Sequence, residues 1–298
     1  MDGVTTADAN SKYRLNIESA YVRDTIDITR WLQLIAGVRY DRFDLATLDM
    51  NSNTNRGRVD EKLSPQAAII LKPADNVSIY YAYSKSYLPA SGDQFSALND
   101  GTVLLQPQGF VNNEVGVKWN INPRLQYTAA VYDLVRTNVP LSIGGGLFVV
   151  SGKNEIKGFE TALNGYVNSD WQAILGYSYT DARITSDTSA TIVAGNRVQL
   201  VPFNQLSLWN KYQINSQLAA GVGVIYFSNS YASSDDTVRL PAFTRVDAGL
   251  YYKYDATWSG QLSVQNVFDV GYWASADGNN NLSPGAPRTI RLSATAKF

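Results

Sequence analysis

The chain has 298 residues, 45% of them hydrophobic, and a formal net charge of −1. With a net charge so close to zero, nothing points to nucleic acid as a partner, because binding it needs a basic face. It contains neither cysteine nor histidine, which excludes disulfides, thiolate metal sites and the commonest general base. We also find no serine-nucleophile motif and no phosphate-cradling glycine loop. We therefore expect neither an enzyme nor a bound cofactor or metal.

The chain starts with "MDGVTTADANSKYRLN", which has no basic region followed by an apolar one and so does not predict a signal peptide. The mean hydropathy is −0.19. No stretch approaches the ~18 uninterrupted apolar residues that a membrane-spanning helix needs. Any membrane protein encoded here must therefore cross by another kind of element.

Apolar and polar residues alternate through most of the chain. In "NNEVGVKWNI", Val115, Val117 and Trp119 lie opposite Glu114 and Lys118. The segments "WQAILGYSYT", "QLSVQNVF" and "TIRLSATAKF" alternate in the same way. Successive side chains of a strand point to opposite faces, so each segment is predicted to be a strand between an apolar and a polar environment.

Turn signals divide the chain regularly. Short breaks fall at 29–30, 73–76, 122–123, 168–170, 215–216 and 255–256, and longer polar breaks fall between them at 49–58, 89–109, 140–152, 185–200, 229–237 and 271–286. Alternating short turns and long loops are typical of an outer-membrane barrel, and tyrosines near the segment ends suit a membrane interface. A soluble β-sandwich is the alternative, but its strands should be shorter.

The breaks delimit about thirteen predicted strands. They lie near 13–28, 31–48, 59–72, 77–88, 110–121, 124–139, 154–167, 171–184, 201–214, 217–228, 238–254, 257–270 and 287–298. With an odd number, the first and last strands run in the same direction, whereas bacterial single-chain barrels pair an even number of antiparallel strands. We therefore expect residues 1–298 to form the C-terminal part of a larger transmembrane barrel.

Several motifs carry a family resemblance. The segments "KLSPQAAIILKPADNVSIYYAYSKSYLPASGDQF", "NNEVGVKWNI", "GFETALNGYVNSDWQAILGYSYTDARI", "VQNVFD" and "PGAPRTIRLSATAKF" occur in this order. Together they resemble the barrel of TonB-dependent outer-membrane siderophore receptors. "SGDQF", "AAVYDLVRTNV" and "NNNLSPGAPR" resemble the catecholate-type ferric siderophore receptors in particular. The likeness extends over essentially the whole chain.

The resemblance implies an outer-membrane protein with a 22-stranded barrel and an N-terminal plug domain. Receptors of this family import ferric siderophores with energy from the TonB–ExbB–ExbD complex, and they contact outer-membrane lipid and lipopolysaccharide. The TonB-contacting box and the plug are absent from this sequence. The terminal Phe298 resembles the signal that the BAM assembly machinery reads. A passive outer-membrane pore or a structural barrel without a plug is the alternative.

A ferric catecholate complex is anionic and aromatic, so arginine and aromatic side chains in the outer loops suit it. On this basis the predicted ligand-binding residues are Phe95, Arg183, Arg197, Tyr231 and Trp273. Each of them has a structural alternative as an interface anchor, a lipopolysaccharide contact or a solvated loop residue. Arg288 is the poorest candidate, because "PGAPR" is typical of a turn into the last strand.

Overall fold

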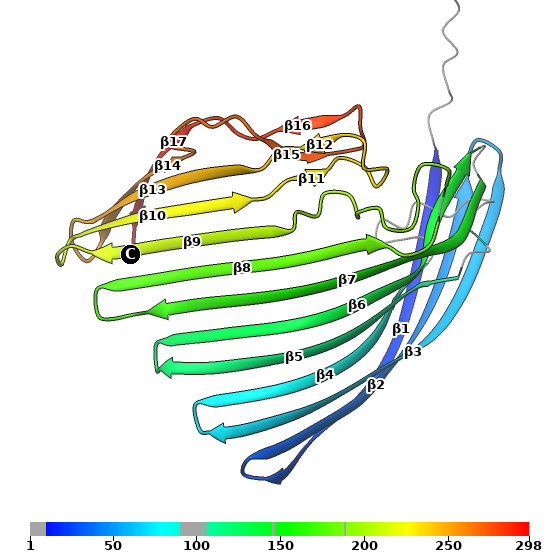
Figure 1. Ribbon diagram of the computed structural model, residues 1–298, viewed down its shortest axis with the longest axis horizontal. Coiled ribbons are helices and arrows are strands. Elements are labelled where there is room, and N and C mark those ends of the chain that lie inside the picture. The colour runs from blue at the N-terminus through cyan, green and yellow to red at the C-terminus, as the bar shows by residue number, and fades with distance from the viewer. Residues whose placement is uncertain (1–9, 90–102, 104–105, 145–146, 188, 298) are drawn as a thin grey trace, which may run out of the picture.

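The computed structural model describes the chain apart from residues 1–9, 90–102, 104–105, 145–146, 188 and 298, and it describes 140–151 by backbone alone. Thirteen strands form one sheet in the order β1-β2-β3-β4-β5-β6-β7-β8-β9-β10-β13-β14-β17. Every neighbouring pair is antiparallel, and the sheet curves like part of a barrel wall (Figure 1). Among the described residues, no helix is long and apolar enough to cross a membrane.

The large sheet and two small hairpins in its loops contain all the strands of the described residues. The strands of the large sheet are β1 (Ser11–Thr29), β2 (Leu32–Asp49), β3 (Thr54–Ala74), β4 (Val77–Leu88), β5 (Gln108–Asn122), β6 (Leu125–Gly144), β7 (Leu147–Tyr166), β8 (Trp171–Ile184), β9 (Asn204–Gln213), β10 (Leu218–Phe227), β13 (Phe243–Lys253), β14 (Trp258–Gln265) and β17 (Thr289–Ala296). The hairpins pair β11 (Ser230–Tyr231) with β12 (Arg239–Leu240) and β15 (Trp273–Ala276) with β16 (Leu282–Pro284).

The prediction of an all-β antiparallel sheet of thirteen strands is confirmed, with differences at particular ends. The loop predicted at 140–152 instead continues the β6–β7 ladder, with register shifts that keep the strands paired. Strand β14 ends at Gln265, earlier than predicted, because Asn266 and Asp269 adopt φ values of 52° and 53°. The Asn266 amide holds that turn together by donating to the carbonyl oxygens of Val270 and Ala286.

The short turns share one local device. In four of them, a side-chain oxygen accepts hydrogen bonds from the backbone N–H groups two and three residues further on. These oxygens belong to Thr29, Asn168, Asn215 and Asp255. Asn and Asp favour such turns because the side chain replaces a backbone acceptor. The conformation of these short turns therefore depends on residues within each turn.

The two faces of the sheet differ in chemistry. One face, here called the apolar face, carries exposed residues such as Val115, Val131 and Leu292, which are 48%, 52% and 80% exposed. The opposite or polar face carries Glu114, Lys118 and the other residues that alternate with them. Exposed apolar side chains on one face are what a barrel presents to lipid, while the polar face lines its lumen.

The sheet is open at both edges. Strands β1 and β17 each have one neighbour among the described strands, β2 and β14. Thirteen antiparallel strands leave β1 and β17 running in the same direction, so they cannot pair antiparallel with each other. Unpaired edges would leave backbone groups without partners in hydrocarbon. Closing the wall with antiparallel pairs therefore requires an odd number of further strands.

Candidate functional site

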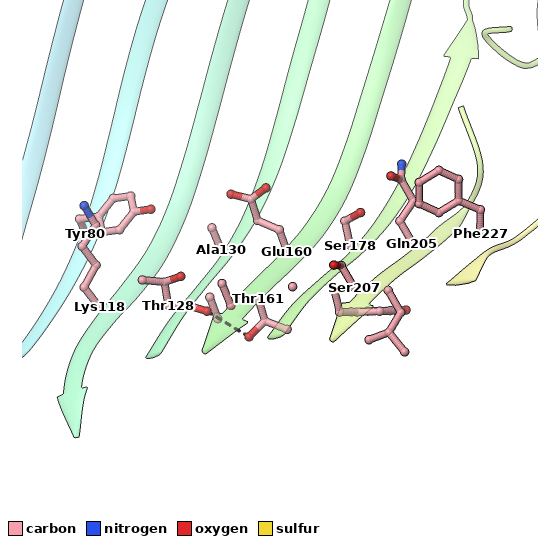
Figure 2. Close-up of a pocket in the computed structure, with 15 residues that line it drawn as sticks. Tyr80, Lys118, Thr128, Ala130, Glu160, Thr161, Ser178, Gln205, Ser207 and Phe227 are labelled. Atoms are coloured by element: carbon pink, nitrogen blue, oxygen red, sulfur yellow. Dashed lines mark hydrogen bonds between the residues drawn. The ribbon is translucent and has the colours of Figure 1, made fainter. Parts of the chain in front are cut away.

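A continuous row of residues crosses the polar face at the middle of the sheet. Cross-strand pairing places the row in the order Tyr80, Gly116, Ala130, Glu160, Ser178, Gln205 and Phe227. Figure 2 shows most of these side chains around a hollow of about 580 Å³, with Lys118 and Thr128 beside them. The row therefore forms a mostly polar band along what would be the lumen wall.

Tyr80 anchors one end of this band. Its hydroxyl donates a 2.6 Å hydrogen bond to Glu114 Oε1, and the Lys118 ammonium lies 5.7 Å from its ring centroid. The ring also covers Gly116, where a Cβ would come within 2.5 Å of ring atoms. Tyr132 covers Gly158 on the next strand pair in the same way. Glycine is required at these positions because the aromatic ring takes the space of a side chain.

Three ion pairs with the same spacing stand on the polar face. Each joins an arginine to the aspartate two residues on in the same strand. The pairs are Arg39–Asp41 at 2.8 Å, Arg58–Asp60 at 2.5 Å and Arg245–Asp247 at 2.9 Å. Residues i and i+2 share a face, which explains the spacing. The arginine charges are thus balanced within the wall itself.

A further arginine lies toward the long-loop end of the same face. Arg136 on β6 pairs across the strands with Phe110 on β5, and its guanidinium lies 5.6 Å from the Phe110 ring. It also donates from Nε and Nη2 to Gln108 Oε1, the Nε bond measuring 2.8 Å. Arg136, Phe110 and Gln108, here called the Arg136 group, place a cation, an aromatic ring and an amide together on the lumen side. This is the chemistry that an anionic aromatic ligand needs.

A separate cluster ties the outer loops together around Phe203. The Arg197 guanidinium carbon lies 3.6 Å from the Phe203 ring centroid and 6.0 Å from that of Tyr231, and Arg183 lies 5.6 Å from Phe203. Arg197 is 5% exposed and donates from Nη2 to the Val201 carbonyl at 2.6 Å. Burial, with the nearby charge of Arg183, lowers the pKa of Arg197 from its ordinary value.

Two more links join this cluster to neighbouring segments. The backbone N–H of Arg197 donates to both carboxylate oxygens of Asp236, and Arg183 bonds Asp181 and the Gly195 carbonyl. The Asn279 amide donates to Asp235 at 2.7 Å, which connects the loop of β15–β16 to the loop of β11–β12. Three outer loops therefore pack against one another.

Comparison with known proteins decides the family of this chain. The family model described as TonB-dependent receptor-like, beta-barrel, matches residues 1–267. The chain belongs to the TonB-dependent receptor family. Its members are outer-membrane transporters rather than enzymes, which agrees with the absence of a catalytic motif.

Two relatives illustrate how far the likeness to TonB-dependent receptors extends. The probable TonB-dependent siderophore receptor PiuA of Acinetobacter baumannii is 29% identical over 94% of this chain and 40% of its own length. The catecholate siderophore receptor Fiu of Escherichia coli K12 is 28% identical over 99% of this chain and 43% of its own length. The chain thus spans about two fifths of the length of these relatives.

Solved receptor structures show the same fold. The crystal structure of PiuA superposes with a TM-score of 0.90 at 26% identity, covering 97% of this chain and 44% of that one. The closed form of Fiu gives 0.86 at 24% identity, covering 100% and 47%. The structures of such relatives are 22-stranded barrels, so the thirteen strands described here correspond to part of a receptor wall.

The structure places the predicted ligand-binding residues in different parts of the receptor wall. Arg183, Arg197 and Tyr231 come together around Phe203, whereas Trp273 lies apart on β15 and is 40% exposed. Phe95 and Phe298 lie outside the described residues. By strand alternation Arg183 shares the apolar face of β8 with Tyr177 and Tyr179, so it does not point into the lumen. Ligand contact by these residues stays a prediction.

The sequence prediction took arginine and aromatic side chains from the loops. It therefore missed Arg136 and Phe110, which lie in predicted strands, and Gln108, which lies in the predicted loop 89–109 but is neither cationic nor aromatic. The signal was present, since in β5 and β6 these residues fall on the same alternation phase as Glu114 and Thr128. Arg288, the poorest candidate, lies in the turn before β17, where its backbone N–H donates to Asp269 Oδ1 at 2.7 Å. Among the described residues, no group of three acidic residues could hold a metal ion.

Proposed function

We propose that residues 1–298 form the C-terminal barrel portion of an outer-membrane receptor that imports ferric siderophores of the catecholate type. Uptake is energised through TonB, which acts on a part of the receptor outside this chain. The single observation that carries the proposal is the match to PiuA and Fiu along nearly the whole chain, in sequence and in fold. Those two proteins bear the names of siderophore receptors.

The polar face supports this proposal at its long-loop end. Arg136, Phe110 and Gln108 together offer a guanidinium, an aromatic face and an amide to a ligand entering the lumen. A ferric catecholate carries negative charge and flat rings, which suit cation and stacking contacts. We therefore place the first ligand contacts of this chain at the Arg136 group rather than at the buried Arg197.

The test uses the complete receptor in a host that lacks its own catecholate receptors. Uptake of radioactive iron is measured with a ferric dihydroxybenzoate complex and, for comparison, with a ferric hydroxamate. The proposal expects catecholate-selective uptake that disappears in a TonB-deficient host. Uptake that is equal for both complexes and independent of TonB would instead identify a passive pore.

A further inference from the structure

The loop 266–288 joins β14 to β17 and carries the β15–β16 hairpin on a fixed base. Asn266 is 1% exposed, and its amide donates to the carbonyl oxygens of Val270 and Ala286, which lie near the two ends of the loop. Its backbone N–H donates to Asp247 Oδ1 on β13 at 2.8 Å. One buried side chain therefore closes the loop and ties it to the wall.

Tyr272 forms a second anchor, on the lumen side of the wall. Its hydroxyl accepts a 3.0 Å hydrogen bond from Arg245 Nη1, and its ring stacks on Phe243 with the centroids 4.3 Å apart. Phe243 and Arg245 share the polar face of β13 with Asp247. The Gly285 N–H donates to the Tyr272 carbonyl at 2.8 Å, and its Cα lies so close to the ring that a Cβ would not fit. Tyr272 and Gly285 thus hold both ends of the hairpin at one point.

At its tip, the hairpin depends on one side chain. The Asn279 amide donates to Asp235 Oδ2 at 2.7 Å and to Thr237 Oγ1 at 2.9 Å, which brings the tip beside the β11–β12 hairpin (Figure 1). Asn280 and Asn281 come next in the sequence and are exposed, and their side chains make no hydrogen bond within the described part of the chain. The contact at the tip is therefore a property of Asn279 alone among these three asparagines.

The segment that receives Asn279 is itself held firmly. Three backbone N–H groups of the β8–β9 loop donate to residues of 229–237, and Ala232 within that segment is 0% exposed. The donors are those of Arg197, Gln199 and Leu200, and the acceptors belong to Asp236, Ser234 and Tyr231. Asp235 and Thr237 therefore stay in place when the hairpin moves.

The hairpin is the weakly held part of this arrangement. Strands β15 and β16 have only four and three residues, and their pairing contains a register shift. A two-stranded hairpin is at best marginally stable in water, and local opening starts where few buried contacts hold a segment. Its base contains a buried amide and a stacked ring, whereas its tip has one partly exposed amide. Opening therefore starts at the tip and leaves the base intact.

We propose that the β15–β16 hairpin is a strap at the long-loop mouth of the lumen. The strap swings as one unit about Tyr272 and Gly285, and the bonds of Asn279 to Asp235 and Thr237 hold it closed. Closed, it narrows the mouth beside β13, and open, it lets an anionic ligand pass into the lumen. The inference rests on the proposed function only for what the strap admits.

Distances between spin labels in the complete receptor test the movement itself. Labels are placed on Thr191→Cys in the β8–β9 loop and on Asn280→Cys in the strap, two exposed sites in a chain that contains no cysteine. We expect Asn279→Ala to raise the ratio of the longer to the shorter distance about tenfold, because two hydrogen bonds are lost. Asn281→Ala is the matched control and should leave the ratio unchanged. An unchanged ratio in Asn279→Ala, or an equal change in both variants, would overturn the proposal.

Covalent bridging tests what the movement does. Asp235→Cys/Asn279→Cys, joined by a short bismaleimide, fixes the strap to its partner segment. Ser275→Cys/Ser283→Cys, joined by the same reagent, only links two positions that already pair across the hairpin. Uptake of iron from ferric dihydroxybenzoate should fall about tenfold with the first bridge, relative to the same variant treated with a monomaleimide. It should stay unchanged with the second bridge.

Equal uptake with and without the first bridge would show that the strap does not control entry. Loss of uptake with both bridges would show that the hairpin has to unfold, which contradicts movement as one unit. If the unmodified receptor takes up no ferric dihydroxybenzoate, the proposed function fails. The spin-label distances still decide in that case whether the strap opens, because they do not depend on the ligand.

Discussion

The Tyr80 ring occupies the space where Gly116, its cross-strand partner, would carry a side chain. A Cβ on Gly116 would meet the Tyr80 ring and hydroxyl at 2.5 Å, and the same hydroxyl is held by Glu114. The glycine and the tyrosine thus form one packed unit at the centre of the polar face. A small residue here reflects a neighbour's size and not flexibility.

Replacing Gly116 with alanine should destabilise the wall. The added Cβ has to displace a ring that is fixed by its hydrogen bond, and overpacking of this kind costs about 1–3 kcal/mol. Unfolding of the receptor in detergent by urea measures the change. Gly176→Ala is the matched control, because it lies on the same face with nothing within 4 Å of its Cβ position. Equal effects of both substitutions would contradict the packing argument.

Two of the ion pairs on the polar face should respond differently to loss of the arginine. The side chains of Arg58 and Asp60 are 12% and 9% exposed, whereas Arg39 is 50% exposed and its partner Asp41 also accepts from Ser19. Arg58→Ala leaves a buried carboxylate unpaired, which costs about 3–5 kcal/mol. Arg39→Ala should cost less, because Asp41, although its side chain is only 10% exposed, keeps the hydrogen bond from Ser19. Urea unfolding measures the free energy of unfolding of both variants. A larger loss of stability for Arg39→Ala than for Arg58→Ala would contradict this prediction.

Substitution of Arg136 and of Arg197 should have different effects: the first should weaken ligand binding, and the second should loosen the packing of the outer loops. Arg136→Ala removes the lumen-facing cation, and we expect siderophore affinity to fall about tenfold, equivalent to ~1.4 kcal/mol. Arg197→Ala removes the guanidinium stacked on Phe203, so hydrogen exchange in 229–242 should accelerate. Fluorescence quenching titration and exchange mass spectrometry measure the two effects. Unchanged affinity in Arg136→Ala would exclude this arginine as a ligand contact.

The link between the β11–β12 and β15–β16 loops should weaken in acid. Burial pushes the pKa of Asp235 upward, but hydrogen bonds from Thr237 and Asn279 outweigh it, so the pKa lies below its ordinary value. A depressed folded-state pKa contributes stability above the unfolded value of ~3.9, and this stability is lost as pH falls through the folded value. The protection of amides in 272–286 against hydrogen exchange, corrected for the intrinsic exchange rate at each pH, should therefore fall below pH ~4. Asp235→Asn should exchange faster already at neutral pH and lose most of that dependence.

The open edges of the sheet predict how the isolated chain behaves. With β1 and β17 parallel and unpaired, residues 1–298 alone should not form a closed barrel in detergent. Closed barrels resist dodecyl sulfate and migrate differently on gels before and after boiling. We expect the refolded chain to show no such shift, and the complete receptor to show it. A heat-dependent shift of the isolated chain would mean that it closes by another pairing.

Local signals in the sequence predicted most of the sheet. The two-residue period of segments such as 110–121 and 171–184 identified the strands and their two faces, because each strand lies between lipid and a wet lumen. The short turns could be predicted from the sequence, because the side chains of Thr29, Asn168 and Asp255 accept hydrogen bonds from backbone N–H groups three residues further on. The β6–β7 extension could not be predicted, because it depends on pairing between the two strands. The early end of β14 was also missed; it results from the left-handed backbone of Asn266 and Asp269 and from the hydrogen bonds of the Asn266 amide to Val270 and Ala286.

The sequence by itself determined the strand count, the face of each strand and the odd number that leaves the wall open. These properties depend on alternation and turn chemistry, which act over a few residues. Only the tertiary structure decided that Arg197 is stacked in a loop cluster and that Arg136 stands beside Phe110. Those relationships depend on the register between strands and on how the loops pack. Alternation puts Arg136 and Phe110 on one face, but it does not determine which residues stand opposite each other.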